Sequence, residues 1–244
     1  MKIRLLRRQT EMKNKKRSTG EILRFFPIAV VVVIAILYFV FRDKITADNI
    51  IGITPKSEAL AVLFMMLLGA VKGLSVFCPF LLLEFISVLI FKDKVTAILV
   101  NLAVIAASFS SAYVAGRISG VVTVDKLRKR YPKFEDFYSL IKKNSLFAVF
   151  AMRVVGVLPM DVVSMYFGAS KISYPKYLVM SLLGAAPDLI LETIIGAEIK
   201  NYRSPAFWIA VVSRLAFTAT TMLVYRLWVK KSKNKTEDTA ENDE

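Results

Sequence analysis

Seven charged residues lie inside long apolar stretches of this 244-residue sequence, and they restrict its chemistry more than any others. They are Lys72, Glu84, Arg153, Asp161, Asp188, Glu192 and Arg214. A charged side chain at the centre of a membrane helix costs about 3 kcal/mol, so seven facing lipid would cost on the order of 20 kcal/mol. We therefore expect these side chains to face the protein interior, to reach the membrane surface or to pair with one another.

Arg153 is the strongest candidate for binding a ligand, because Gly156 and then Pro159 break the helix soon after it. Such a break leaves backbone N–H groups free beside a guanidinium, and this combination suits a phosphate group. The alternative is an ion pair between Arg153 and Asp161 without any ligand.

Asp188 and Glu192 are spaced i, i+4, which places both carboxylates on one face of a helix. Repulsion between like charges this close favours uptake of a proton by one of them, as proton exchange requires. The alternative is structural, with these acids paired to Arg214 in the next apolar segment or to Arg153. The sequence leaves both interpretations open.

Missing residue types exclude much of the common enzyme chemistry. The chain has no histidine and one cysteine, Cys78, which rules out Ser-His-Asp hydrolysis, histidine zinc sites, histidine proton relays and an internal disulfide. It has no Gly-rich phosphate loop and no Asp-Gly dipeptide, and nothing supplies a nucleophile with its base. We expect no catalytic residue, no cofactor and no metal site, and therefore no enzyme.

The elements that position the seven charges are those of an all-α membrane protein, since 56% of the residues are hydrophobic and gather into runs of membrane length. About four transmembrane helices are predicted, at residues 25–41, 95–116, 177–199 and 206–228. The chain then divides into a basic segment at 1–24, the first span, a membrane domain at 59–199, the last span and a charged tail at 229–244.

Two further apolar stretches, 59–91 and 145–169, are interrupted at membrane depth. Besides charged residues, the breaks are predicted at Gly73, Pro79, Gly156, Pro159 and Gly168. Backbone groups freed by such residues survive in a membrane only when they are buried in protein or line a cavity. We predict two re-entrant helical hairpins, and kinked helices that span the membrane are the alternative.

The net charge of +15 is concentrated in blocks at 1–24, 117–143 and 226–235, each next to an apolar segment. Basic residues beside membrane spans mark the cytoplasmic side, so both termini are predicted in the cytoplasm and no nucleic acid is expected as a partner. With this topology the hairpin-plus-span units at 59–116 and 145–199 enter from opposite sides. Such an inverted repeat is a transporter architecture.

The basic block at 117–143 also has an amphipathic pattern. Apolar residues recur at spacings of three and four, at Val124, Leu127, Tyr131, Phe134, Tyr138 and Ile141. We predict a linker that lies on the inner leaflet and binds anionic lipid, with binding of a protein partner as the alternative. Membrane lipids are the expected partners, and homo-oligomerisation is left open.

These residues resemble the DedA-like membrane proteins with a VTT domain, also called the SNARE-associated Golgi protein family. The strongest likeness comprises Phe150, Arg153, Pro159, Gly168, Tyr177, Ser181, Gly184, Pro187 and Gly196. In the first half, Gly116-Arg117-x2-Gly120 resembles the family's Gly-Arg-x2-Gly. Gly156 stands where many members have proline, and Ser164-Met165 where many have Asn-Tyr.

The resemblance implies two opposed re-entrant hairpins, a bacterial plasma-membrane location and transport of a lipid across the bilayer. Bacterial relatives are linked to undecaprenyl phosphate recycling and proton-dependent membrane homeostasis, and eukaryotic relatives scramble phospholipids. The family's functional arginine corresponds to Arg153, and an acidic residue of its first hairpin to Glu84.

We therefore expect a lipid flippase or scramblase in which Arg153 holds a phosphate. Glu84 or Asp161 would titrate, and Asp188 and Glu192 would couple protons or line the path. The alternatives are an ion- or solute-coupled transporter, and a non-transporting protein whose buried charges lock its helices together.

Overall fold

The computed structural model describes residues 52, 54–75, 79–137, 140–141 and 144–241. The chain divides into two units, Met1–Ile53 and Thr54–Glu244, and the described helices below belong to the second. The predicted basic segment and first span, at 1–24 and 25–41, lie outside the described residues. The second unit is helical, and no strand occurs among its described residues.

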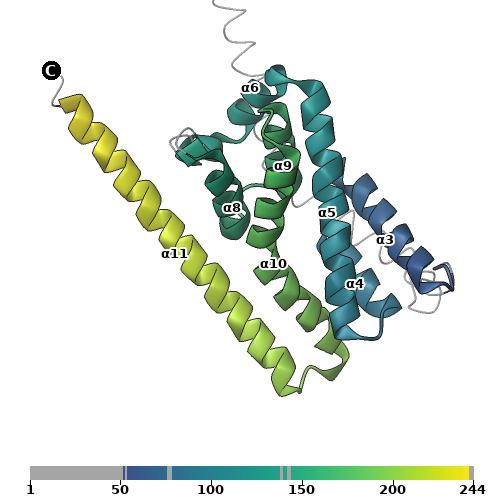
Figure 1. The fold of residues 1–244 in the computed structure, drawn as a ribbon. Coiled ribbons are helices and arrows are strands. Elements are labelled where there is room, and N and C mark those ends of the chain that lie inside the picture. Colours follow the sequence, from purple (N-terminus) through teal and green to yellow (C-terminus); the bar gives the residue numbers. More distant parts are fainter. Residues whose placement is uncertain (1–51, 53, 76–78, 138–139, 142–143, 242–244) are drawn as a thin grey trace, which may run out of the picture. The chain divides into compact units, whose positions relative to one another are not determined.

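Figure 1 shows the order of the helices in the second unit. They are α3 (Glu58–Gly73), α4 (Leu81–Ile90), α5 (Lys94–Ser119), α6 (Val121–Arg130), η1 (Pro132–Phe137), α8 (Ser145–Val155), α9 (Met160–Ala169), α10 (Tyr174–Glu198), η2 (Ile199–Asn201) and α11 (Pro205–Glu241).

Three of these elements are long and apolar enough to cross a membrane. They comprise α5, α10 extended through η2 to Asn201, and the part of α11 up to Lys230. Their bounds agree with the predicted spans at 95–116, 177–199 and 206–228. Asp93 caps the start of α5 by accepting a hydrogen bond from the Thr96 backbone N–H at 2.8 Å, and this bond lowers the pKa of the Asp93 carboxyl.

The two predicted interruptions are true helix breaks. In the first, α3 ends at Gly73 and α4 begins two residues after Pro79. In the second, α8 ends at Val155 and is capped by Gly156, whose φ of 63° lies in the left-handed region that suits glycine, and Pro159 precedes α9 with φ −56°.

The prediction of a break at Gly168 is wrong, because this residue lies inside α9, one position before its end. A Cβ at Gly168 would overlap the backbone carbonyl of Tyr113 on α5. Gly168 is needed for close approach of the two helices, and a glycine in sequence does not by itself distinguish this role from a break.

The helices pack in two equivalent sets. The first helix of each broken pair packs along the long helix that follows it, α3 on α5 and α8 on α10. The second helix of each pair crosses to the long helix of the other set, so that α4 packs on α10 and α9 on α5. Because α5 and α10 also pack on each other, the contacts of one set repeat those of the other.

Glycines permit these close contacts. Gly69 and Gly73 of α3 lie directly against the backbone of α5 at Val104 and Ser108, and Gly116 of α5 lies against the backbone of Met165 on α9. Small residues at such crossings let helix backbones approach closely, which is a main source of helix association in membranes.

Gly116 and Gly196 provide a matched test of this packing. A Cβ at Gly116 would overlap the Met165 carbonyl, whereas a Cβ at Gly196 would make ordinary contacts at 3.6 Å with Phe85. We expect Gly116→Ala to lower the thermal unfolding temperature in detergent by several degrees. Gly196→Ala should leave that temperature unchanged or raise it, because alanine favours a helix over glycine by about 1 kcal/mol. Equal effects would contradict the packing.

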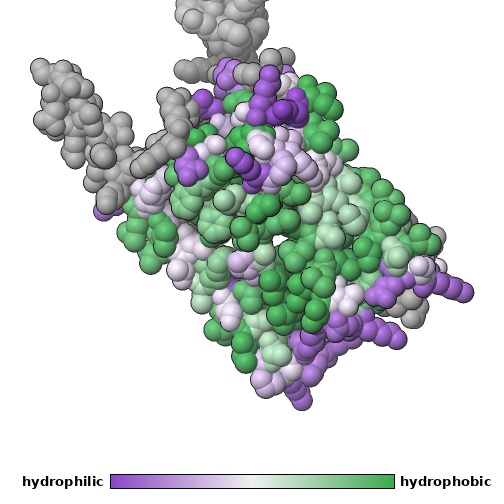
Figure 2. All heavy atoms as spheres, viewed as in Figure 1, coloured by the Kyte–Doolittle hydropathy of each residue, from purple (hydrophilic) through white to green (hydrophobic). Residues whose placement is uncertain are grey.

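Apolar side chains cover the outside of the long helices. On α11 they include Trp208, Ile209, Val212, Leu215, Leu223, Val224 and Leu227, each more than half exposed. Figure 2 shows apolar surface across the middle of the visible face and hydrophilic side chains gathered towards its ends. This distribution is that of a protein surrounded by lipid.

The predicted amphipathic linker packs against the membrane helices. Phe134 stacks on Tyr166 of α9 at 4.4 Å between ring centroids, and Phe137 stacks on Tyr225 of α11 at 5.6 Å. Exposed basic side chains lie on the linker at Lys126, Lys129, Arg130 and Lys133. The amphipathic pattern is therefore real, but these two aromatic side chains are covered by protein instead of lipid.

Candidate functional site

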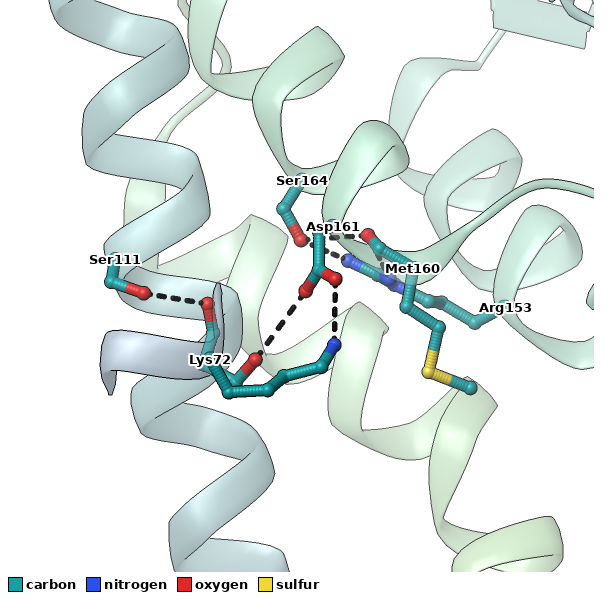
Figure 3. Close-up of polar contacts among 7 residues, drawn as sticks. Lys72, Ser111, Arg153, Met160, Asp161 and Ser164 are labelled. Carbon is teal, nitrogen blue, oxygen red and sulfur yellow. Dashed lines mark hydrogen bonds and ion pairs between the residues drawn. The ribbon is translucent and has the colours of Figure 1, made fainter. Parts of the chain in front are cut away.

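The two helix breaks meet at a buried ion pair. Lys72, in the last turn of α3, donates to Asp161 Oδ2 in the first turn of α9 at 2.6 Å from its Nζ. Ser108 of α5 lies on the other side, with its Oγ 3.4 Å from Asp161 Oδ1. All three residues are buried, and Figure 3 shows the contact of Lys72 with Asp161. Ser108 is near the middle of α5, so both breaks reach the same depth of the bundle.

Arg153 approaches this ion pair from the second broken pair. In Figure 3 the side chains of Lys72 and Arg153 extend toward Asp161 from opposite sides. The Arg153 guanidinium donates to the Met160 carbonyl at 2.7 Å and to Ser164 Oγ at 2.7 Å. It lies within electrostatic reach of Asp161 but forms no ion pair with it.

Two aromatic side chains complete the surroundings of the guanidinium. Tyr177 of α10 accepts a hydrogen bond from Arg153 Nη2 at 3.0 Å, and the Phe109 ring of α5 lies 3.7 Å from the guanidinium carbon. Arg153 is only 3% exposed, yet its Nε has no hydrogen-bond partner. A buried donor without a partner costs stability, so an acceptor at this position would be favourable.

The site contains three side chains to which the sequence analysis assigns no role in it. Lys72 is one of the seven intramembrane charges, and it occupies the last turn of α3 as Arg153 occupies the last turn of α8. This equivalence of position is the feature of the sequence that indicates a role for Lys72 in the same site as Arg153. In the sequence, Ser164 and Tyr177 stand out only by their place in the family pattern, because their contact with Arg153 depends on tertiary structure.

Asp188, Glu192 and Arg214 form a second charged cluster. Arg214 of α11 donates from Nε to Asp188 Oδ1 at 3.0 Å and from Nη2 to Glu192 Oε1, so one guanidinium bridges two acids on α10. The structural partnership with Arg214 is therefore present, and none of these acids pairs with Arg153.

Glu84 belongs to this second cluster. It is 2% exposed, and the charged groups within electrostatic reach are Glu192 and Asp188 on α10 and Arg214 on α11. The Glu84 and Glu192 carboxyl groups approach each other, but neither oxygen of Glu84 meets the geometry of a hydrogen bond. The predicted acids thus separate into two groups, with Asp161 beside Arg153 and the other three around Arg214.

The remaining candidate residues lie within or at the ends of the helices. Gly184 of α10 lies against the Phe150 carbonyl and the Arg153 side chain, and Pro187 lies inside the same helix. Arg117 donates to the Tyr113 hydroxyl at 3.4 Å, and Gly120 caps the end of α5 with φ 70°.

Among the residues that the structure describes, no group of three His, Cys, Asp or Glu side chains could hold a metal ion.

Arg214 supplies a stability test for the second cluster. We expect Arg214→Gln to lower the thermal unfolding temperature in detergent, because it leaves Asp188 and Glu192 as adjacent carboxylates without their shared cation. Arg203→Gln is the matched control, since Arg203 is exposed between α10 and α11. Unfolding of the Arg214 variant at the temperature of the control would show that the bridge adds no stability.

The apolar helices and their buried charges define a multi-pass membrane protein whose two broken helix pairs meet in its interior. More specifically, the chain belongs to the VTT domain family, because the family's sequence profile matches residues 54–198, which is more than half of its length. The uncharacterized protein YqeD of Bacillus subtilis (strain 168) is 25% identical over 171 residues, covering 70% of this chain and 80% of YqeD. No solved structure matches the chain.

Proposed function

We propose that the protein transports a phosphate-bearing lipid across the cell membrane, through a polar path between two re-entrant helix pairs. The observation that carries the proposal is the ion pair of Lys72 with Asp161, which joins the two breaks in the interior with Arg153 beside it. Two cations accompany one anion here, so the cluster has an excess positive charge that suits an anionic headgroup.

Helix lengths support a re-entrant arrangement. The helices α4, α8 and α9 have 10 or 11 residues each, about 15 Å at 1.5 Å per residue, which is half of a bilayer core of about 30 Å. Since Gly73 and Asp161 both lie at Ser108 in the middle of α5, each pair would enter and leave on one side and reach the midplane. The two pairs enter from opposite sides, with both termini in the cytoplasm.

A lipid is the preferred cargo because, among the described residues, the helix that carries Lys72 also has an outward apolar face. Lys72 is buried, whereas its neighbour Val71 is 68% exposed, and Leu60, Leu63 and Leu67 continue this outward face. A phosphate headgroup would enter the cluster while its acyl chains stay in the bilayer. The family membership supports a membrane transport or homeostasis role.

Transport can be tested with the purified protein in liposomes that contain a fluorescent phospholipid. We expect Arg153→Ala to reduce the transbilayer rate at least tenfold, because it removes the guanidinium that would hold the phosphate. Arg203→Ala, a change of the same type at an exposed position, should transport as wild type does. Equal rates for wild type and Arg153→Ala would refute this role of Arg153.

The assay also separates transport from a purely structural role. If the buried charges only lock helices together, Arg153→Ala lowers the thermal unfolding temperature and wild-type protein moves no lipid under any ion gradient. A variant that stays folded at the assay temperature but loses transport supports the transport role.

Ion-coupled transport is a second candidate, and the buried carboxylate of Glu84 favours it. The three acids Glu84, Asp188 and Glu192 share one cation, Arg214, so the cluster would be negatively charged when all are ionised, and uptake of a proton would reduce that charge. We expect a pH-sensitive dye inside liposomes to report proton entry that is lost in Glu192→Gln and Glu84→Gln. Glu58→Gln at the exposed start of α3 is the control. Unchanged proton entry in both cluster variants would contradict the coupling role.

A further inference from the structure

Asp161 occupies an unusual position between two cations of different helix pairs. Its carboxylate is bound by Lys72 and faces Ser108, and it lies within electrostatic reach of Arg153. A carboxylate held in this way has the charge and oxygen acceptors of a phosphate, but it is attached to the protein. The cluster can therefore keep its cations compensated when no ligand is present.

The charge of this cluster is well defined by its residues. Lys72 and Arg153 contribute two positive charges and Asp161 one negative charge, and the other groups that contact them are neutral: Ser108, Ser164, Tyr177, Phe109 and the Met160 carbonyl. The second charged cluster lies on α4, α10 and α11, and it supplies no hydrogen bond to these residues. The site accordingly has a net charge of about one positive unit.

The unpartnered Arg153 Nε indicates that the cluster still has a free donor. This atom is buried and has no hydrogen-bond acceptor, although the rest of the guanidinium is held by three partners. An additional anionic oxygen beside Arg153 would satisfy it.

We propose that Asp161 is a built-in counter-ion that makes the site selective for singly charged phosphate headgroups. The inference rests on the proposed transport function and names its substrate class. In a buried site the complex with the smallest residual charge is favoured, because an uncompensated charge there is costly. With Asp161 ionised, a phosphodiester neutralises the site, whereas a phosphomonoester with nearly two negative charges leaves it negative.

The test compares two fluorescent lipids with identical acyl chains in liposomes containing the full-length protein. One has a phosphodiester headgroup, as in phosphatidylglycerol, and the other a phosphomonoester, as in phosphatidic acid, both measured at about pH 8. We expect wild type to transport the phosphodiester faster. Asp161→Asn raises the site charge to two and should shift the rate ratio toward the phosphomonoester by about tenfold.

Two further variants keep the test decisive if Asp161→Asn is unstable. Lys72→Met combined with Asp161→Asn removes the ion pair and restores a site charge of one, so the phosphodiester preference should return. Lys72→Met alone leaves no net positive charge and should slow both lipids. Asp125→Asn, on the exposed side of α6, is the control and should leave the rate ratio unchanged.

The outcomes distinguish this inference from the transport proposal itself. If wild type moves neither lipid, the proposed function fails. If lipids move but all variants keep one rate ratio, transport stands and the counter-ion role of Asp161 is overturned. An excess of inorganic phosphate should leave the rates unchanged, and abolition of transport by it would overturn the assignment to a lipid headgroup in favour of free phosphate.

Discussion

The ion pair between Lys72 and Asp161 is the contact on which the interior of this membrane domain depends. Each broken helix pair ends its first helix with a cation and begins its second with an acid, and neither charge could face hydrocarbon without a large penalty. Pairing the cation of one unit with the acid of the other satisfies both and brings the two breaks to the same depth. The glycine contacts of α3 with α5 then become possible, because the helix ends are held in register.

The two equivalent sets of helices do not have equivalent electrostatics. By position, Lys72 corresponds to Arg153, and the first-turn acid Asp161 corresponds to Glu84. The first of these cations has an acidic partner in the other set, but Arg153 is held by neutral groups and Glu84 faces the acids of α10. The domain therefore has a positively charged cluster at the Lys72–Asp161 ion pair and an acidic cluster around Arg214.

Much of this architecture could be predicted from the sequence, because apolar run length and proline or glycine interruptions are local signals. The three spans described by the structure and the breaks at Gly73 and Gly156 follow from them. Partner choice could not be predicted in the same way. Both Lys72 and Arg153 are candidate partners of Asp161 in the sequence. Because α3 and α9 both pack on α5, Lys72 is the one that forms the ion pair. The prediction of a break at Gly168 is wrong for a related reason, because glycine is favoured both at helix breaks and at close helix contacts.

The short linker η1 has a mechanical consequence for the second unit. Phe134 is stacked on Tyr166 of α9, and Asp136 accepts a hydrogen bond from the Tyr225 hydroxyl of α11 at 2.6 Å. The six residues of η1 therefore contact both helices. The helix that carries Asp161 is thereby fastened near its far end to the last membrane helix. A displacement of α9 would therefore be transmitted through η1 to Tyr225 of α11, and motion that begins at the buried ion pair would reach the last helix.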